Sequence, residues 1–246
     1  MTRYVTAEEA ADQLQRRLAE LAPDWVVAAP DLQQQLVSAL ADEPRQLLTT
    51  MSFEAYLAWL NEDRFAEWED GQVVLMSPAS LRHVLIANFL AALLSEYVLR
   101  HQLGVVLSAP FQMALPELQR SREPDILFLA DVNQHRLRDT YLDGPADLVI
   151  EIVSPESVTR DRVIKFQEYA RAGIPEYWLV DPVTRSMTGY QLHKGAYALT
   201  ELDSERRLHS TVLPGFWVLP DWLWHEPLPS VVATLASITA SPPPAD

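Results

Sequence analysis

The chain has 246 residues, of which 48% are hydrophobic and 22% are charged, as in an ordinary soluble globular protein. It contains no cysteine, which excludes disulfide bonds and thiolate metal sites, so any metal must be held by carboxylates, carbonyls, histidines and water. The formal net charge of -15 argues against a nucleic-acid partner, because phosphate contacts come from Lys and Arg, but charge segregated between regions keeps that class open.

The N-terminus, MTRYVTAEEAADQ, lacks the apolar core of a signal peptide, so we expect a cytoplasmic protein. The most apolar predicted helix, over 81–104, is interrupted by Arg82, Glu96 and Arg100, and we expect no membrane span. Acidic residues are dense in the first 70 positions, whereas cationic residues gather around the middle of the chain: Arg120, Arg122, Arg136, Arg138, Arg160, Arg162, Lys165 and Arg171.

The pattern of apolar residues divides the chain into three parts. Two helical patterns, over 7–21 and 30–40, predict an N-terminal helical appendage at 1–48. The main domain is expected at 49–230. Residues 231–246, which end in SPPPAD, are expected to form a C-terminal tail.

The main domain begins with helical patterns and one hairpin. Amphipathic helices are predicted over 49–60 and 81–101, and His83 falls in the first turn of the second. Asp70-Gly71 between two extended segments is a strong signal for a β-hairpin. Glu67 lies just before this turn, and by itself it is better explained as an exposed glutamate of an edge strand.

Two apolar strands each carry one carboxylate. After a predicted strand over 105–115, Pro124 sets an extended backbone, and Asp125 opens an apolar run to residue 129, although Asp at a strand start is also common in plain turns. The run over 147–153 is apolar at almost every position, as in a strand buried on both faces, and Glu151 sits in its middle. A buried carboxylate needs compensation, so Glu151 is either a site residue or a structural glutamate paired with an arginine.

A helix follows this strand. Thr159 can cap it, and Gly173 ends it at the position where glycine is preferred. Lys165 lies next to the apolar stripe of this helix, so it can lean over the strand towards Glu151. The alternative is a surface pair between Asp161 and Lys165 four residues apart, which is worth only a few tenths of a kcal/mol.

The remaining elements complete a sheet. A further apolar strand is predicted over 176–181, and 187–192 with 196–202 form an expected antiparallel pair. The aromatic stretch over 213–224 is expected to pack over the core.

Together the carboxylates indicate a metal site. Asp125 and Glu151 stand in strands that are close in sequence and are expected to be neighbours. Two adjacent carboxylates repel unless a divalent cation lies between them, and an all-oxygen site suits Mg²⁺. A lysine such as Lys165 beside that site can orient water and stabilise charge on a phosphate, as in a phosphodiesterase.

These residues resemble the Uma-two-type family of restriction endonucleases, within the PD-(D/E)XK nuclease superfamily. The resemblance runs from about Leu48 to Leu223 and rests on several matches in order. They are Glu67…Asp70-Gly71, His83, Pro124-Asp125, the DLVIEIVSP segment from Asp147, Asp161…Lys165…Tyr169…Ala172-Gly173, and the YWLVDP segment from Tyr177.

The resemblance implies a mixed α/β fold with a restriction-endonuclease-like core, in which helices flank a mixed β-sheet. Carried over by position, Asp125 and Glu151 are the two acids that bind Mg²⁺ or Mn²⁺. We expect the Ile152 carbonyl to be a third metal ligand.

The chain departs from the family pattern at one position, since the lysine of the usual E-x-K motif would fall at Val153. The resemblance implies that this role moves to the following helix, where Lys165 lies. Glu67 would match an extra acid that supports the metal site. The catalytic set expected from the resemblance is therefore Glu67, Asp125, Glu151 and Lys165.

Two functions from different classes are consistent with this sequence. The first is a Mg²⁺- or Mn²⁺-dependent endonuclease, a hydrolase of DNA phosphodiester bonds, with no membrane partner and with a homodimer as an open oligomeric state. The alternative is a non-catalytic interaction or structural protein on the same fold, which the net charge favours. A binding module need not retain all four residues of the catalytic set.

Overall fold

The computed structural model describes residues 3–4, 46–48, 51–60, 66–76, 78–154 and 160–240. Its strands are β1 (Arg3–Tyr4), β2 (Gln46–Leu48), β3 (Ala66–Glu69), β4 (Gln72–Leu75), β5 (Gly104–Ser108), β6 (Gln112–Leu115), β7 (Arg120–Arg122), β8 (Ile126–Ala130), β9 (Tyr141–Asp143), β10 (Leu148–Ile152), β11 (Glu176–Asp181), β12 (Ser186–His193), β13 (Ala196–Leu199), β14 (Leu208–His209) and β15 (Trp217–Val218). Its helices are α4 (Phe53–Trp59), α5 (Leu81–His101), α6 (Phe166–Ala172) and α7 (Val231–Ala240), with 3-10 turns η1 (Pro116–Leu118), η2 (Asp131–Arg136) and η4 (Pro220–Trp224) and a π-helical segment η3 (Arg160–Lys165).

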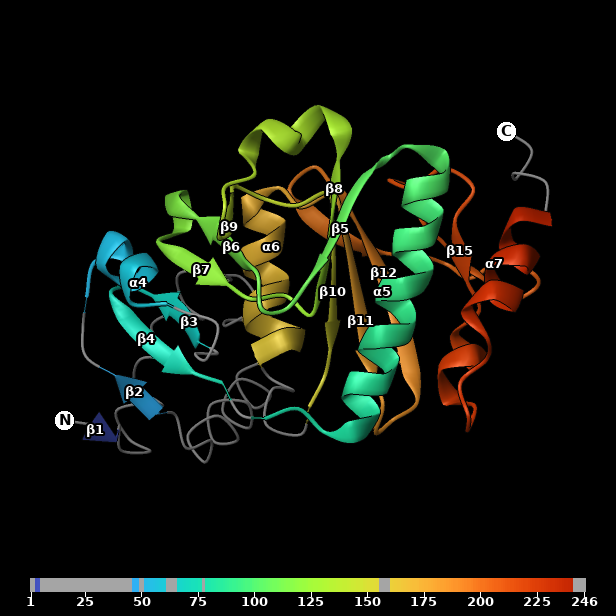
Figure 1. Cartoon of the computed structure of the whole chain (residues 1–246), viewed down its shortest axis with the longest axis horizontal. Helices are drawn as coiled ribbons and strands as arrows, with labels where there is room; N and C mark the ends of the chain where they lie inside the picture. The colour runs from blue at the N-terminus through green and yellow to red at the C-terminus, as the bar shows by residue number, and fades with distance from the viewer. Residues whose placement is uncertain are drawn as a thin grey trace.

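The strands form two large mixed sheets and one small one. The six-stranded sheet has the order β13-β12-β11-β10-β8-β5, and the seven-stranded sheet has the order β1-β2-β4-β3-β7-β6-β9. In Figure 1 the strands of the seven-stranded sheet lie with α4 on one side of α6, and α5 lies on the other side. The mixed α/β fold expected from the sequence is confirmed.

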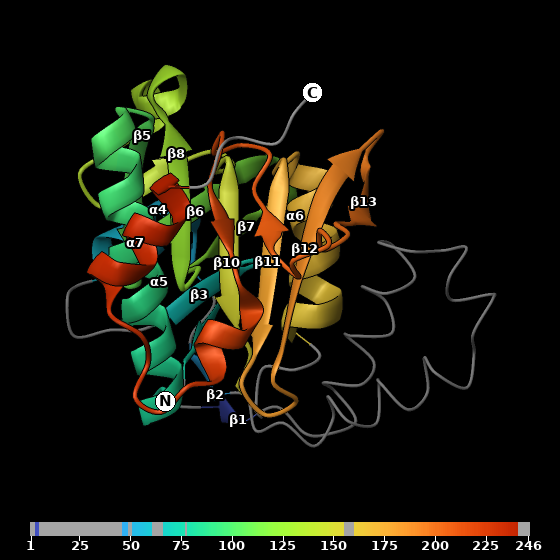
Figure 2. The same ribbon diagram turned by 90° about the vertical axis from the view of Figure 1, so that its right-hand side faces the viewer.

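Helices cover both faces of the six-stranded sheet, as the turned view in Figure 2 shows, with α5 and α7 on one side and α6 on the other. Alternate residues along the central strands therefore enter two cores. Ile150 packs with Phe89 of α5, whereas Val149 packs with Tyr169 of α6. The second core also takes in Met113 of β6, so it joins the two sheets. Because these strands are buried on both faces, they are apolar at nearly every position.

The central pair of strands has the neighbour relation expected from the sequence. β8 and β10 are antiparallel, with Ile126 opposite Ile150 and Phe128 opposite Leu148. β10 and β11 are parallel and are connected through η3 and α6. The chain passes between the two sheets at Pro124, where β7 ends and β8 begins.

The Asp70-Gly71 hairpin joins β3 and β4, as predicted. Asp70 has φ 49° and Gly71 has φ 82°, the positive values that a tight hairpin turn requires. β2 pairs with β4, so the end of the expected N-terminal appendage contributes a strand to this sheet. The helices predicted at 7–21 and 30–40 lie outside the described residues.

Ser80 caps α5, its hydroxyl accepting from the His83 N–H at 3.2 Å. By length and composition alone α5 is apolar enough to cross a membrane, with a mean hydropathy of 1.3. Phe89, Leu90 and Leu93 of α5 nevertheless pack onto the six-stranded sheet. α5 is thus the core helix of this layer.

Two boundaries differ from those expected. The single strand predicted over 105–115 is two strands, because β5 pairs with β8 whereas β6 pairs with β7 and β9 in the other sheet. Pro110 interrupts the strand and cannot donate to a ladder. The tail expected from 231 begins with α7, whose Leu235 and Ile238 belong to the α5 core, so this part of the boundary is wrong. Residues 241–246 lie outside the described part of the chain.

The segment after β10 is a π-helix followed by an α-helix, where one α-helix was expected. η3 ends at Lys165, α6 begins at Phe166, and Gly173 ends it with φ 82°. The Thr159 cap lies outside the described residues. π-Helical turns are rare and frequently occur at functional sites, and this one ends on Lys165.

Candidate functional site

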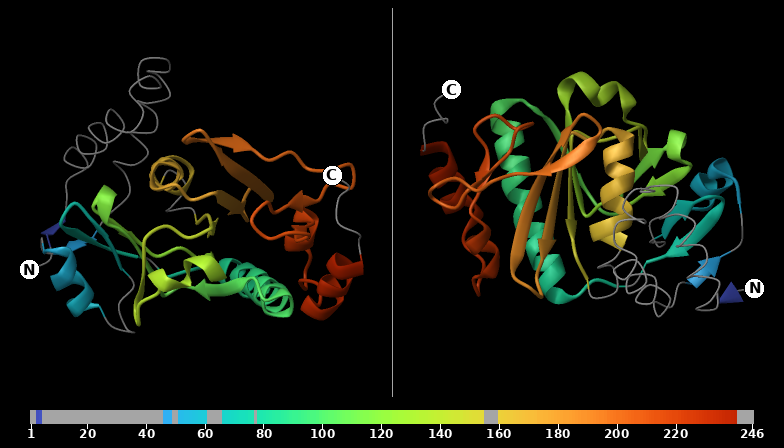
Figure 3. Two further views of the ribbon diagram at one scale, coloured as in Figure 1. Left: turned by 90° about the horizontal axis from the view of Figure 1, so that it is seen from above. Right: turned by 180° about the vertical axis from the view of Figure 1, so that it is seen from behind.

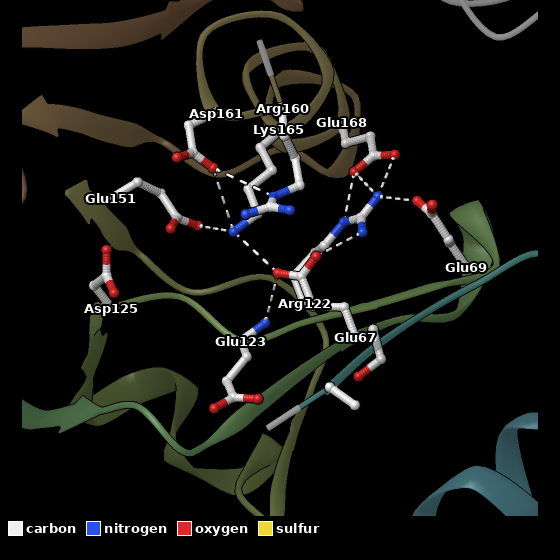
Figure 4. Close-up of polar contacts among 12 residues, drawn as sticks. Glu67, Glu69, Arg122, Glu123, Asp125, Glu151, Arg160, Asp161, Lys165 and Glu168 are labelled. Carbon is white, nitrogen blue, oxygen red and sulfur yellow. Dashed lines mark hydrogen bonds and ion pairs between the residues drawn. The ribbon is translucent and has the colours of Figure 1, made fainter. Parts of the chain in front are cut away.

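Three of the expected site residues meet where the two sheets and the helix η3 converge (Figure 4). Lys165 comes from η3, Glu67 from β3 and Glu151 from β10. The Lys165 ammonium lies 2.9 Å from Glu151 Oε1 and 3.0 Å from Glu67 Oε1. It also lies 3.6 Å from Asp161 Oδ1, so the pair four residues apart exists, but as one of three contacts of a buried side chain.

Glu67 is fully buried, so it is not the exposed edge-strand glutamate that the sequence alone left open. Its Oε1 faces Lys165, and its Oε2 accepts from the Arg122 guanidinium at 2.9 Å. Burial raises the pKa of the Glu67 carboxyl, but the Lys165 and Arg122 cations outweigh burial and lower the pKa to about 2. Glu67 is therefore an ionised carboxylate that links two cations.

Glu151 has a different environment. It is 3% exposed, and its Oε1 accepts from Lys165 and from the Tyr169 hydroxyl at 2.6 Å. Burial raises the pKa of the Glu151 carboxyl to about 8 against the opposing effect of Lys165, with the negative charges of Asp161 and Asp125 adding to burial. A cation bound beside Glu151 would favour the ionised form of this carboxyl, which burial and the neighbouring carboxylates disfavour.

Asp125 lies at the start of β8 and is the more accessible acid, with a side chain 19% exposed. Its Oδ1 lies 2.9 Å from His83 Nε2, and its Oδ2 accepts from the Ile152 N–H at 2.6 Å. Burial lowers the pKa of His83, but the bond to Asp125 outweighs it and raises the pKa above its ordinary value. The weak signal of a histidine in the first turn of a helix thus marks a residue in contact with the site.

Asp125 and Glu151 lie on the same face of the sheet. One residue beyond the paired Ile126 and Ile150, the register places Asp125 opposite Glu151. Their carboxylates point toward the same space in Figure 4. Directly opposite side chains of an antiparallel pair lie about 5 Å apart at Cβ, which is close enough to share one ion.

The backbone of Ile152 faces β8 at a position where proline replaces the usual N–H donor. The N–H of Ala109, directly after β5, donates to the Asp125 carbonyl at 3.2 Å, so the odd-numbered positions of β8 bond towards β5 and the even-numbered positions bond towards β10. The next even position is Pro124, opposite Ile152, and proline has no N–H to donate. The Asp125 side chain takes the Ile152 N–H in its place. The carbonyl at 152 lies on the same side of β10, where Pro124 offers it no N–H.

An ion-pair network supports the site from the helix and the seven-stranded sheet. The Arg122 guanidinium donates to both oxygens of Glu168 at 2.8 Å and to Glu69 at 2.9 Å, besides Glu67. Arg120 also bonds Glu168, and it contacts Asp70 at the hairpin turn. The hypothesis of a buried glutamate paired with arginine thus describes Glu67 and Glu168, whereas Glu151 pairs with a lysine.

The departure at Val153 has a packing reason. Val153 is buried in the core beneath α6, its N–H bonded to Val180. The chain has two lysines in all, Lys165 and Lys194, against seventeen arginines, and Lys165 is 2% exposed. A lysine at this buried position places a compact ammonium in the site, whereas an arginine would place a larger, branched guanidinium there.

Three contacts were not expected from the sequence: His83 with Asp125, and Arg122 with both Glu67 and Glu168. Arg122 stood in a loop-like stretch of arginines, and only its position opposite Glu67 across β3 and β7 makes it a partner. Charge alternation between the two strands was the one available signal.

The donor set fits a hard divalent ion. Among the described residues no three side chains of His, Asp or Glu form a ligand cluster, so a metal here would rest on the two carboxylates together with backbone and water oxygens. Two carboxylates and a carbonyl, with the remaining positions left to water and phosphate, are what Mg²⁺ typically uses.

The comparisons agree with this fold. The family model described as "Uma2: Putative restriction endonuclease" matches residues 53–223. Among solved structures, one titled "a putative nuclease belonging to DUF820 from Anabaena variabilis ATCC 29413" matches with a TM-score of 0.59 and 13% identity. That match covers 71% of this chain and 97% of the other, and at this identity it concerns the fold.

No curated protein matches the chain. The family match covers well over half of the sequence and includes every residue of the expected catalytic set. The structural match has the same nuclease-like fold, with mixed sheets flanked by helices. The chain therefore belongs to the Uma2 family of restriction-endonuclease-like proteins.

Proposed function

We propose that the chain is a metal-dependent endonuclease that hydrolyses phosphodiester bonds of DNA. The observation that carries the proposal is the arrangement of Asp125, bonded to the Ile152 N–H, and Glu151 on one face of the sheet, with the buried ammonium of Lys165 beside Glu151. The family supports a nuclease at the coarser level.

In this proposal Asp125, Glu151 and the Ile152 carbonyl hold Mg²⁺ or Mn²⁺. The bound ion would supply positive charge to the phosphate and to a water molecule. His83 fixes one oxygen of Asp125, and Tyr169 and Lys165 occupy one oxygen of Glu151, so both acids are held before any ligand arrives.

Lys165, whose buried ammonium lies 2.9 Å from Glu151, is the cation that this proposal assigns to the charge on the phosphate. Its ammonium is held by carboxylates whose contacts raise its pKa well above the ordinary value against the effect of burial, so it stays charged at neutral pH. A permanent cation at this point stabilises the negative charge that develops on the phosphate during attack.

The arginines near the site divide into two groups. Arg120 and Arg122 are buried and paired with the Glu168 carboxylate, which assigns them to the ion-pair network behind the site. Arg162 of η3 is partly exposed and pairs with Asp181, and Arg171 in the last turn of α6 is exposed, so the proposal assigns phosphate contacts to these two arginines.

A nicking assay on supercoiled DNA with Mg²⁺, Mn²⁺ or chelator tests this function. Asp125→Ala and Glu151→Ala should abolish metal-dependent cleavage, and Lys165→Ala should reduce it by roughly a hundred- to a thousand-fold. Glu176→Gln is the matched control, because Glu176 is a buried carboxylate that accepts from Ser210 and Thr211 outside the site.

Equal cleavage by wild type and all variants, at equal folding, would identify a contaminant. The non-catalytic protein would then be the remaining function, and the near-complete burial of Glu67, Glu151 and Lys165 is the observation that favours it. The proposal includes a cytoplasmic location without a membrane partner. A homodimer stays a prediction, tested by sedimentation.

A further inference from the structure

Glu67 has no carboxylate oxygen without a cation beside it. Oε1 lies 3.0 Å from the Lys165 ammonium and also faces the Glu123 N–H at 3.4 Å, and Oε2 accepts from Arg122 at 2.9 Å. Glu151, by contrast, accepts both of its hydrogen bonds from the described residues on one oxygen, Oε1. Glu67 is thus built to hold cations of this chain, whereas Glu151 keeps an oxygen for a ligand.

Three carboxylates in turn hold the Arg122 guanidinium in one orientation. Its Nε and one terminal nitrogen donate to the two oxygens of Glu168, the same terminal nitrogen reaches Glu69, and the other terminal nitrogen reaches Glu67. The side chain is 1% exposed. A planar guanidinium with several donors in fixed directions can make these contacts, and an ammonium cannot make them all.

The elements that carry these residues explain why the chain needs the network. Lys165 and Glu168 are three residues apart at the junction of η3 and α6, so they share one side of the helix. Glu67 and Arg122 come from β3 and β7 of the other sheet. Figure 3 shows from above that α6 lies between the sheets. The network therefore links the helix that carries the lysine to the sheet on its far side.

We propose that Glu67 and Arg122 are positioning residues for Lys165: Arg122, fixed by Glu168, orients Glu67, and Glu67 holds the Lys165 ammonium beside Glu151. Glu67 acts on the lysine and does not bind the metal, which differs from the supporting acid that the family resemblance implies. The catalytic consequence rests on the proposed nuclease function, whereas the placement of the lysine does not.

The first test measures the position of Lys165 without any cleavage. Because the chain has two lysines, an amine-acetylating reagent followed by peptide mass spectrometry gives the rate at Lys165 with Lys194 as the internal reference. Glu67→Gln should raise the Lys165 rate relative to Lys194 by roughly tenfold, the difference between a charged and a neutral hydrogen bond. Arg122→Lys keeps the positive charge but loses the forked donors of the guanidinium. It should also raise the acetylation rate of Lys165 relative to Lys194, although Lys165 itself is unchanged.

Glu176→Gln separates positioning from general loosening, since it changes a buried carboxylate that lies outside the network. It should leave the Lys165 ratio unchanged even where it lowers the melting temperature. An equal rise in Glu67→Gln and Glu176→Gln, or no rise in folded Glu67→Gln, would overturn the proposal.

The second test uses metal binding and cleavage. Mn²⁺ affinity from calorimetry should stay within about threefold of wild type in Glu67→Gln, whereas loss of a ligand or its support costs about 10–100-fold. The rate constant kcat should fall with KM for DNA unchanged, and the Glu67→Gln/Lys165→Met double variant should be no slower than Lys165→Met. Mn²⁺ affinity that falls as far as in Asp125→Asn would make Glu67 a metal ligand and overturn the proposal. A wild type that cleaves no DNA would refute the nuclease function, and the acetylation ratios would still decide the positioning.

Discussion

Replacing Lys165 by methionine removes one positive charge from a buried cluster while keeping a flexible side chain of similar length. The ammonium lies 2.9 Å from Glu151, 3.0 Å from Glu67 and 3.6 Å from Asp161, and all three carboxylates are nearly fully buried. Removing one partner of a buried ion pair costs about 3–5 kcal/mol, because the remaining charge is left uncompensated. A surface pair four residues apart contributes about 0.3–0.5 kcal/mol. The expected loss of unfolding free energy is thus about ten times larger for a buried cluster than for a surface pair.

The expected loss is measurable by urea unfolding at pH 7 with a metal chelator present. For a chain of this size a change of 1 kcal/mol moves Tm by about 2–4 °C, so Lys165→Met should melt roughly 6–20 °C below wild type. The control is Lys194→Met, the same change at the other lysine, which is exposed in the turn between β12 and β13 and should stay within about 0.5 kcal/mol.

The loss should also depend on pH. Lys165 and Arg122 hold the pKa of Glu67 at about 2, below its ordinary value, so this carboxylate contributes stability that is present above its unfolded pKa and is lost as the pH falls towards 2. In Lys165→Met the pKa of Glu67 rises. The difference in unfolding free energy between wild type and this variant should therefore narrow between pH 7 and pH 4. A folded Lys165→Met within 0.5 kcal/mol of wild type at pH 7 would refute the reasoning, because the cluster would then be stable without its lysine.

Four further outcomes are expected. Asp125→Asn and Glu151→Gln should each abolish the stabilisation of the protein by Mn²⁺ in thermal melts, and an unchanged Mn²⁺ shift in either would remove that residue from the metal site. Nicking should weaken steeply between 50 and 200 mM salt, on the scale known for proteins that contact several phosphates, and a flat salt profile would contradict phosphate contacts by arginine. Asp203 accepts from His209 and Arg207, and these bonds lower its pKa against the opposing effect of burial. Asp203→Asn should therefore lower Tm at pH 7, and the difference in Tm from wild type should shrink as the pH falls below the ordinary pKa of a carboxyl group, whereas a difference that stays constant in acid would point to packing. Gly104→Ala should destabilise the β5 edge, since an added Cβ would lie 2.1 Å from the Leu129 carbonyl at φ +151°, and an unchanged Tm would show that the backbone shifts freely.

Local pattern was sufficient for most elements of the main domain. The Asp70-Gly71 hairpin and the Gly173 helix end depend on neighbours within a few residues, and each has the predicted form. The pairing of β8 with β10 followed from two apolar runs close in sequence. The identities of the acids and the lysine were visible for the same reason, because a charge in an apolar stretch stands out.

The sequence could not decide which partner each charge meets. Glu67 and Arg122 are 55 residues apart and face each other only because β3 pairs with β7, so the choice between an exposed and a buried glutamate depended on sheet order. The split of 105–115 between two sheets depended in the same way on long-range pairing.

The tertiary structure also decided what kind of lysine stands at 165. The sequence allowed two positions for Lys165: on the surface, paired with Asp161, or in the site, facing Glu151. The two positions differ by a rotation of the helix about its own axis. Packing of Tyr169 into the core beneath β10 sets that rotation, and the Glu168–Arg122 bonds hold it. Burial and charge compensation are properties of contacts between distant segments, and they turn a local pattern into a site.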